Sequence, residues 1–86
     1  MDIVLYIKNI DDSIKILKLL KYNDLEFEVE AIEDIHITNV VGEKVKKLPH
    51  VVIDGERVGG YYDLVEYLMN KNIINYAGEP TWKMNN

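Results

Sequence analysis

The 86-residue chain contains no cysteine, and this absence excludes several kinds of chemistry. Thiol–disulfide exchange requires a thiolate nucleophile, and most iron–sulfur clusters are held by several cysteine thiolates. Small secreted domains usually depend on disulfides for their stability, so a domain without them suits a reducing compartment. We therefore expect a cytoplasmic protein that carries out no redox catalysis.

Other features are scarce as well. Lysine and arginine number 10 against 15 acidic residues, giving a net charge of −5, so we expect no nucleic-acid partner. The N-terminal apolar run Ile3–Ile7 is too short for a signal peptide or a membrane span, so we expect no membrane association. His36 and His50 lack metal-ligand spacing and have no cysteine to assist them, so no metal site is expected.

The apolar residues, 48% of the chain, predict one folded domain. The β-branched run Ile3–Ile7 predicts a strand covered on both faces. A helix is predicted at Ile14–Tyr22, ending at Asn23 and Asp24. Its N-cap candidates are Asn9, Asp11, Asp12 and Ser13. Spacings of four, three and three assign its buried face to Ile10, Ile14, Leu17 and Leu20.

The next segments alternate between strand and helix patterns. Residues Leu25–Ile32 place Leu25, Phe27 and Val29 on one face and glutamates on the other, as in an edge strand. A short helix is expected within Glu33–Lys47. His50–Ile53 and Glu56–Val58 are predicted strands, joined by a hairpin turn at Asp54-Gly55.

Gly59-Gly60 opens the last predicted helix, from Tyr61 to about Lys71. Its buried face is assigned to Tyr61, Leu64, Val65 and Leu68. The element order predicts an α/β domain at residues 1–71, with a mixed four-stranded sheet and two to three helices, followed by a polar tail at 72–86. Trp82 in that tail would either anchor a partner or fold back on its own domain.

Two segments resemble glutaredoxins. The run from Leu48 to Gly60, LPHVVIDGERVGG, is similar to the family's Val-Pro, apolar strand, Asp-Gly and Gly-Gly. Tyr6–Leu20 resembles the family's first strand, active-site loop and first helix. The small size and the Gly-Gly-Tyr-Tyr-Asp sequence also resemble the phage-type members. The resemblance covers about residues 2–71 and implies a thioredoxin-like fold of the glutaredoxin subclass.

The resemblance also implies where the active site has been lost. The Cys-x-x-Cys or Cys-x-x-Ser motif of these glutathione-dependent disulfide oxidoreductases falls on Ile10-Asp11-Asp12-Ser13. Ile10 takes the nucleophile position, and Ser13 matches the serine of the monothiol kind. A reactive thiol relies on the helix N-terminus to lower its pKa. Here the carboxylates of Asp11 and Asp12 would satisfy the free N–H groups and cancel the positive potential at that end.

By the same resemblance, a ligand or partner groove would contain Lys8, Ile10, Asp11, Asp12, Ser13, Lys47, Leu48, Pro49, Gly59, Gly60, Tyr61, Tyr62 and Asp63. In the family, the lysine meets the glycyl carboxylate of glutathione, the proline is cis, and the Gly-Gly turn receives the γ-glutamyl carboxylate. This chain departs from that pattern because Lys8 lies one residue closer to the nucleophile position, and Tyr62 replaces a polar contact. Retained peptide binding and a purely structural role for Pro49 both stay open.

Lysines beside Pro49 form the one local basic segment. With Lys8, residues Lys44, Lys46 and Lys47 would form a basic rim that suits an acidic partner, or simply a solvated loop. The leading hypothesis is a non-catalytic module that holds an unidentified protein partner in the groove. One alternative is a glutathione-binding module without turnover, for which no other cofactor is expected. The other is a protein that counts as a glutaredoxin, a thiol–disulfide oxidoreductase, by homology only, so that its redox activity is assumed.

Overall fold

A computed structural model of the chain describes residues 1–32 and 48–81. The helix predicted within Glu33–Lys47 and the predicted role of Trp82 lie outside these ranges. The strands are β1 (Ile3–Ile7), β2 (Glu28–Ala31), β3 (His50–Ile53) and β4 (Glu56–Gly59), in the order β2-β1-β3-β4. β1 runs parallel to β2 and antiparallel to β3, and β3 and β4 are antiparallel. The predicted mixed four-stranded sheet and the edge position of the acidic strand are confirmed.

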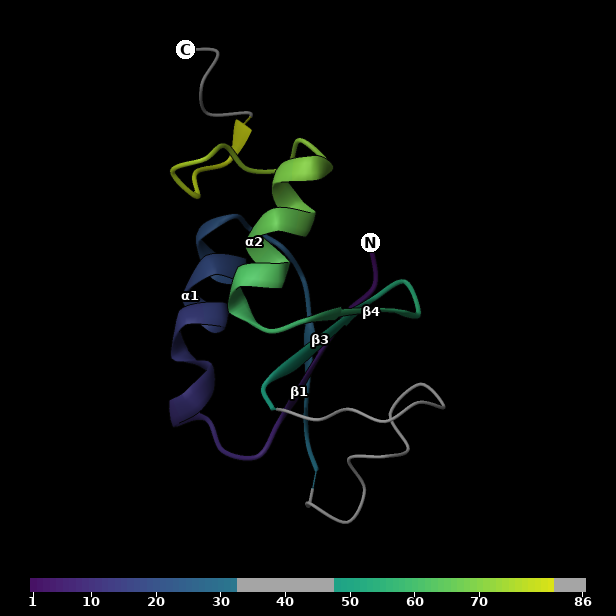
Figure 1. The fold of residues 1–86 in the computed structure, drawn as a ribbon. Helices are drawn as coiled ribbons and strands as arrows, with labels where there is room; N and C mark the ends of the chain where they lie inside the picture. The colour runs from purple at the N-terminus through teal and green to yellow at the C-terminus, as the bar shows by residue number, and fades with distance from the viewer. Residues whose placement is uncertain (33–47, 82–86) are drawn as a thin grey trace.

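Two helices, α1 (Ile14–Tyr22) and α2 (Tyr61–Asn70), lie side by side against one face of the sheet (Figure 1). A 3₁₀ turn, η1 (Asp11–Ser13), leads into α1. The core fills the space between sheet and helices and consists of Ile3, Leu5, Ile7, Ile16, Leu19, Leu20, Val51, Ile53, Leu64, Leu68 and Ile74. Neither helix is long and apolar enough to cross a membrane, as far as the described ranges extend.

The buried face of α1 agrees with the predicted one only in part, because Leu20 is buried and Leu17 packs against the core, but Ile10 and Ile14 do not. Ile10 and Ile14 are 56% and 44% exposed, whereas Ile16 is 1% exposed. Ser13 and Asn23 are buried along with Ile16, although both are polar. The Asn23 amide nitrogen donates to the Leu19 carbonyl at 2.8 Å and to the Gly78 carbonyl at 3.3 Å.

This correction has a physical cause. Because α1 carries apolar residues on more than one side, Ile16, Leu19 and Leu20 form a second apolar face beside the predicted one. Ser13 and Asn23, the buried polar residues at the two ends of the helix, favour the observed face, since a buried polar group is tolerated where it finds a hydrogen-bond partner. With Asn23 turned inward, its amide nitrogen joins the end of the helix to the turn at Gly78, while its Oδ1 is buried without a hydrogen-bond partner among the described residues.

Both helices end in the same hydrogen-bonded turn. After α1, Asp24 has φ 55°, the Leu25 N–H donates to the Leu20 carbonyl, and the Asp24 N–H donates to the Lys21 carbonyl. After α2, Asn72 has φ 58°, with the matching bonds from Ile73 to Leu68 and from Asn72 to Met69. This is the Schellman arrangement, here built on Asp and Asn.

The first Schellman turn shortens the second strand. The strand was predicted from Leu25, but β2 begins at Glu28 because the Leu25 N–H is still bonded to the end of α1. Leu25 and Phe27 pack against the core as predicted. Val29, which the alternation grouped with them, is exposed because β2 lies at the sheet edge.

The β3–β4 hairpin and α2 agree with the sequence pattern. Asp54 and Gly55 have φ 52° and 81°, and both angles are the positive ones that a type I′ turn requires. On α2, Leu64 and Leu68 are buried, and Tyr61 and Val65 pack against the same core. The predicted inner face of this helix is therefore correct.

Residues beyond α2 also contribute to the core. Ile74 is buried and forms an isolated β-bridge with Pro80, which is fully buried too. The Asn75 side-chain oxygen accepts hydrogen bonds from the N–H groups of Ala77 and Glu79, closing the turn between them. The division of the chain at residue 71 stays a prediction, but this part of the tail packs on the domain.

Candidate functional site

The end of β1, the start of β3 and the end of β4 lie at the same end of the sheet. Tyr6 pairs with His50, so the end of β1 lies beside the start of β3. Val51 pairs with Gly59, which puts the end of β4 at the same end of the sheet. The loop that begins at Lys8 therefore leaves the sheet at the same end as the Leu48–Pro49 segment and the Gly59-Gly60 turn.

The proline segment lies against the start of α2. A side chain at Gly60 would place its first carbon 3.9 Å from the Pro49 carbonyl oxygen, so the two backbones are in van der Waals reach. The Leu48–Pro49 peptide bond is cis. Leu48 is half-buried beneath the sheet, packed with Val52 on the face away from the helices. Lys47, which the sequence added to this segment, lies outside the described residues.

The loop at residues 10–13, where the resemblance would put the cysteine motif, is closed by Asn9. Its side-chain oxygen accepts a hydrogen bond from the Asp12 N–H at 3.1 Å, and the Ser13 N–H donates to the Ile10 carbonyl at 3.0 Å. Ser13 is fully buried, and its hydroxyl donates to the Asn9 carbonyl at 3.4 Å. The side chains of Ile10, Asp11 and Asp12 are exposed. Of this motif, only these three can meet a partner without rearrangement.

A carboxylate of the chain itself covers the start of α2. The Gly60 N–H donates to Asp63 Oδ2 at 3.2 Å. Gly59 has φ 121°, and a side-chain carbon there would lie 2.8 Å from the Asp63 Cγ, so this carboxylate packs directly on the Gly-Gly turn. Because Gly60 has no side chain, only this half of a capping box forms. The carboxylate weakens the positive potential that would attract an anion to this helix N-terminus.

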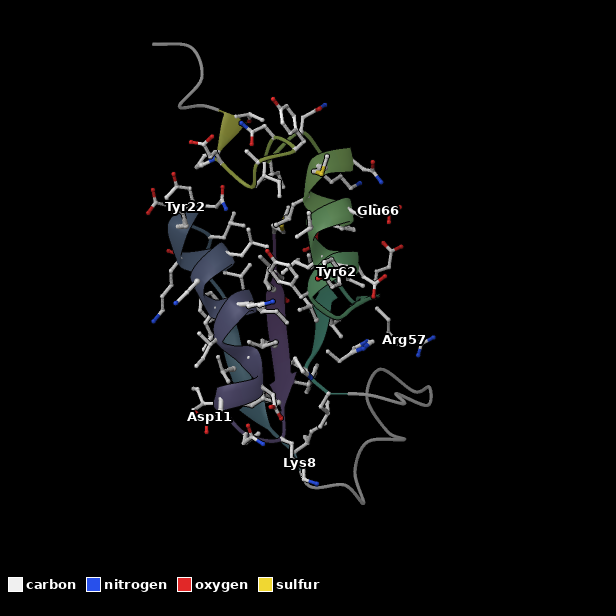
Figure 2. All side chains as sticks on the ribbon, turned by 60° about the vertical axis from the view of Figure 1, so that its left-hand side comes forward. Lys8, Asp11, Tyr22, Arg57, Tyr62 and Glu66 are labelled. Atoms are coloured by element: carbon white, nitrogen blue, oxygen red, sulfur yellow. The ribbon has the colours of Figure 1, made fainter. Side chains whose placement is uncertain are left out.

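Tyr61 and Tyr62 extend the site toward α1. Their rings meet edge to face, 5.3 Å apart and at 78°, and Lys15 Nζ lies 5.9 Å from the centre of the Tyr61 ring. Tyr62 is 79% exposed. Figure 2 shows Lys8 and Asp11 at the lower end of the molecule and Tyr62 higher, on α2. Lys8 and Tyr62 therefore lie at different heights of the molecule in Figure 2, with Tyr62 toward α1.

His50 lies beside the predicted site residues in the chain, although the sequence pattern suggested it only as a poor metal ligand. It follows Pro49, and its Nε2 is buried without a hydrogen-bond partner among the residues that the structure describes. Burial lowers its pKa below the ordinary 6.5, the positive charge of Arg57 lowers it further, and Asp63 acts in the opposite direction. No three His, Asp or Glu side chains gather into a metal-binding group in residues 1–32 and 48–81.

The lowered pKa of His50 makes the stability of the fold depend on pH. Below the ordinary pKa of 6.5 the unfolded chain binds a proton that the folded chain resists, so stability falls as the pH is lowered through this range. Above it, this contribution is fully present. We expect His50→Gln to lose less unfolding free energy than the parent chain between about pH 7 and pH 5, by urea titration. His36→Gln is the control, and equal slopes for the parent and His50→Gln would contradict the assignment.

Comparison with solved structures identifies the fold. The glutaredoxin of E. coli superposes with a TM-score of 0.61, at 15% sequence identity, over 83% of this chain and 96% of that one. The predicted thioredoxin-like fold is therefore confirmed as the fold that glutaredoxin has. No family model and no curated protein matches the sequence.

Proposed function

We propose that this chain is a non-catalytic binding domain that holds a protein partner at the surface formed by Ile10, Leu48–Pro49 and Gly59–Tyr62. The observation that carries the proposal is Ile10, which is 56% exposed at the position of the lost nucleophile. A chain without cysteine has no thiolate for disulfide exchange, so this position has an apolar contact to offer instead. Covering an apolar side chain stabilises a complex by roughly 25 cal/mol per Å² removed from water.

Ile14 supports the same surface. It follows Ile10 by four residues and is exposed as well, so the pair offers two neighbouring apolar side chains at the start of α1. Single exposed apolar residues are common on proteins, whereas a group of them beside a groove is typical of an interaction site. The exposed Tyr62 adds an aromatic side chain of the kind enriched in interfaces.

Glutathione is the weaker alternative. The Asp63 carboxylate that accepts from the Gly60 N–H would repel the carboxylate of a ligand at the same turn. Millimolar reduced glutathione is therefore expected to leave the amide NMR signals of Lys8, Leu48 and Gly60 in place. Shifts confined to these residues would favour the glutathione-binding alternative.

The loss of redox chemistry is tested directly. In an assay for disulfide reduction coupled to glutathione reductase, the chain is expected to read at the buffer background, because it has no thiol. An active glutaredoxin in the same plate serves as the positive control. Turnover that scales with the concentration of this chain would refute the non-catalytic assignment.

The partner surface is tested by photo-crosslinking in the cells from which the chain comes. A benzophenone amino acid at position 10 is expected to give an adduct of one defined mass. The same group in place of Glu66, exposed on the side of α2 labelled in Figure 2, is the matched control and is expected to give none. Equal adducts from both positions, or none from either, would count against the proposed surface.

A further inference from the structure

A second surface, over the helices, has the composition of a binding groove. An open groove of about 960 Å³ lies between α1, the start of α2 and the turn at residues 77–79. Three lysines and three tyrosines form most of its lining: Lys15, Lys18, Lys21, Tyr22, Tyr61 and Tyr62. Figure 2 shows Tyr22 at the end of α1 and Tyr62 on α2. We refer to this feature as the Lys–Tyr groove.

The charge of the Lys–Tyr groove is opposite to that of the whole chain. The chain carries a net charge of −5, whereas the groove has three lysines and one carboxylate, that of Glu79. Within residues 1–32 and 48–81, no ion pair neutralises Lys15, Lys18 or Lys21, and all three side chains are exposed. A concave surface of one sign concentrates ligands of the other sign.

The turn that walls the groove is fixed to α1. The Asn23 side-chain nitrogen donates to the Gly78 carbonyl at 3.3 Å, and a side-chain carbon at Gly78 would lie 3.9 Å from Leu19 Cδ1. The turn itself is closed by the hydrogen bonds that Asn75 accepts from Ala77 and Glu79. The groove is therefore formed before any ligand arrives, which reduces the ordering cost of binding.

We propose that the Lys–Tyr groove binds an acidic segment of a partner protein. Successive lysines at Lys15, Lys18 and Lys21 rise by about 4.5 Å each along α1, so together they span about the length of three extended residues. The rings of Tyr61 and Tyr62 supply apolar surface beside this charge. A segment that combines carboxylates with bulky apolar side chains matches both features. This assignment does not rest on the function proposed above: the groove shares Tyr61 and Tyr62 with that surface, but its lysines and its second wall come from α1 and the turn at residues 77–79.

The charge of the chain argues against nucleic acid as the ligand. Nucleic-acid binding grows with the number of phosphates that lysine and arginine neutralise. Three lysines on a protein with a net charge of −5 neutralise few phosphates, and the remaining acidic surface repels a long polyanion. A short acidic peptide contacts only the groove, so the remaining acidic surface does not repel it.

The test uses the intact chain and a synthetic peptide in which glutamate alternates with leucine. Two-dimensional amide NMR at low ionic strength is expected to show shifts that cluster at Lys15, Lys18, Tyr62 and Gly78. The double variant Lys15→Gln/Lys18→Gln is expected to bind the peptide roughly tenfold more weakly, because exposed pairs each contribute modestly. Its thermal unfolding is expected to be unchanged, since both side chains are exposed.

The chain offers a matched control. Lys71 Nζ lies 5.6 Å from the Tyr67 ring centre, a contact like that of Lys15 with Tyr61 but outside the groove. Lys71→Gln is expected to leave peptide binding unchanged. Binding is also expected to weaken as salt rises from about 0.05 M to about 0.5 M.

Three results would overturn the assignment. One is an absence of shifts at millimolar peptide, and another is an equal loss of affinity in Lys71→Gln and in the groove variants. The third is tighter binding of an oligothymidylate at the same amides, which would identify the ligand as a nucleic acid. Each of these leaves the crosslinking result at position 10 unaffected, so the two proposals fail separately.

Discussion

Replacing Ile16 by alanine is expected to lower the free energy of unfolding by about 2–5 kcal/mol, while the same change at Ile14 costs less than about 0.5 kcal/mol. The two isoleucines are two positions apart in the same helix, so helix propensity and the chemistry of the change are matched. They differ in burial, at 1% exposed for Ile16 and 44% for Ile14. Ile16→Ala leaves a cavity among the core residues, whereas Ile14→Ala removes a side chain that water already contacts.

Urea unfolding followed by circular dichroism measures this difference. The m-value is expected to stay constant, because neither substitution changes the surface exposed on unfolding by much. The pattern of apolar spacing had placed Ile14 inside, so the experiment also distinguishes the two orientations of α1. A larger loss in Ile14→Ala than in Ile16→Ala would show that the helix packs by its other face.

A chain that ends at Lys71 is expected to be markedly less stable than one that ends at Thr81. The shorter chain loses the buried Ile74 and Pro80 and the carbonyl of Gly78 that accepts from Asn23. Loss of one buried isoleucine side chain alone costs about 2–5 kcal/mol. Because small domains have total stabilities of about 5–15 kcal/mol, we expect the short chain to be partly unfolded at 37 °C.

The control for this truncation is the chain that ends at Thr81. It keeps every described contact of the tail and removes only residues 82–86. Its unfolding midpoint is expected to match that of the full chain. If both truncated chains unfold alike, and as the full chain does, the domain ends at residue 71 as the sequence had suggested, and the packing of Ile74 contributes nothing measurable.

Most of the fold could be predicted from local patterns. The hairpin turn at Asp54-Gly55, the apolar run of β1 and the inner face of α2 each carry one dominant signal, and the structure agrees with all three. The predicted face of α1 was wrong at Ile10 and Ile14, because apolar residues also lie on a second side of the helix. The choice depends on Asn23 and Gly78, which are 55 positions apart and meet only in the folded chain.

The candidate site also has features that could be predicted and features that could not. Pro49 and Gly60 were placed together by the resemblance to glutaredoxins, and the strand order β2-β1-β3-β4 brings the ends of β1, β3 and β4 together so that Gly60 lies beside Pro49. Asn9 was one of the predicted N-cap candidates, and its side chain accepts from the Asp12 N–H. The contact of Asp63 with Gly60 was not predicted, because it depends on a hydrogen bond whose geometry the residue types leave open. The Lys–Tyr groove could not be predicted from the sequence, because one of its walls is formed by the tail residues Ala77, Gly78 and Glu79.

The exposed carboxylates of Asp11 and Asp12 also limit what a thiol placed in this loop could do. In Ile10→Cys, two neighbouring negative charges would raise the pKa of the new thiol and keep it protonated at neutral pH. The turn is closed by Asn9, so the fold does not require either aspartate. A reactive thiol at position 10 therefore takes more than one substitution, and both aspartates can be replaced without loss of the hydrogen bond that closes the turn.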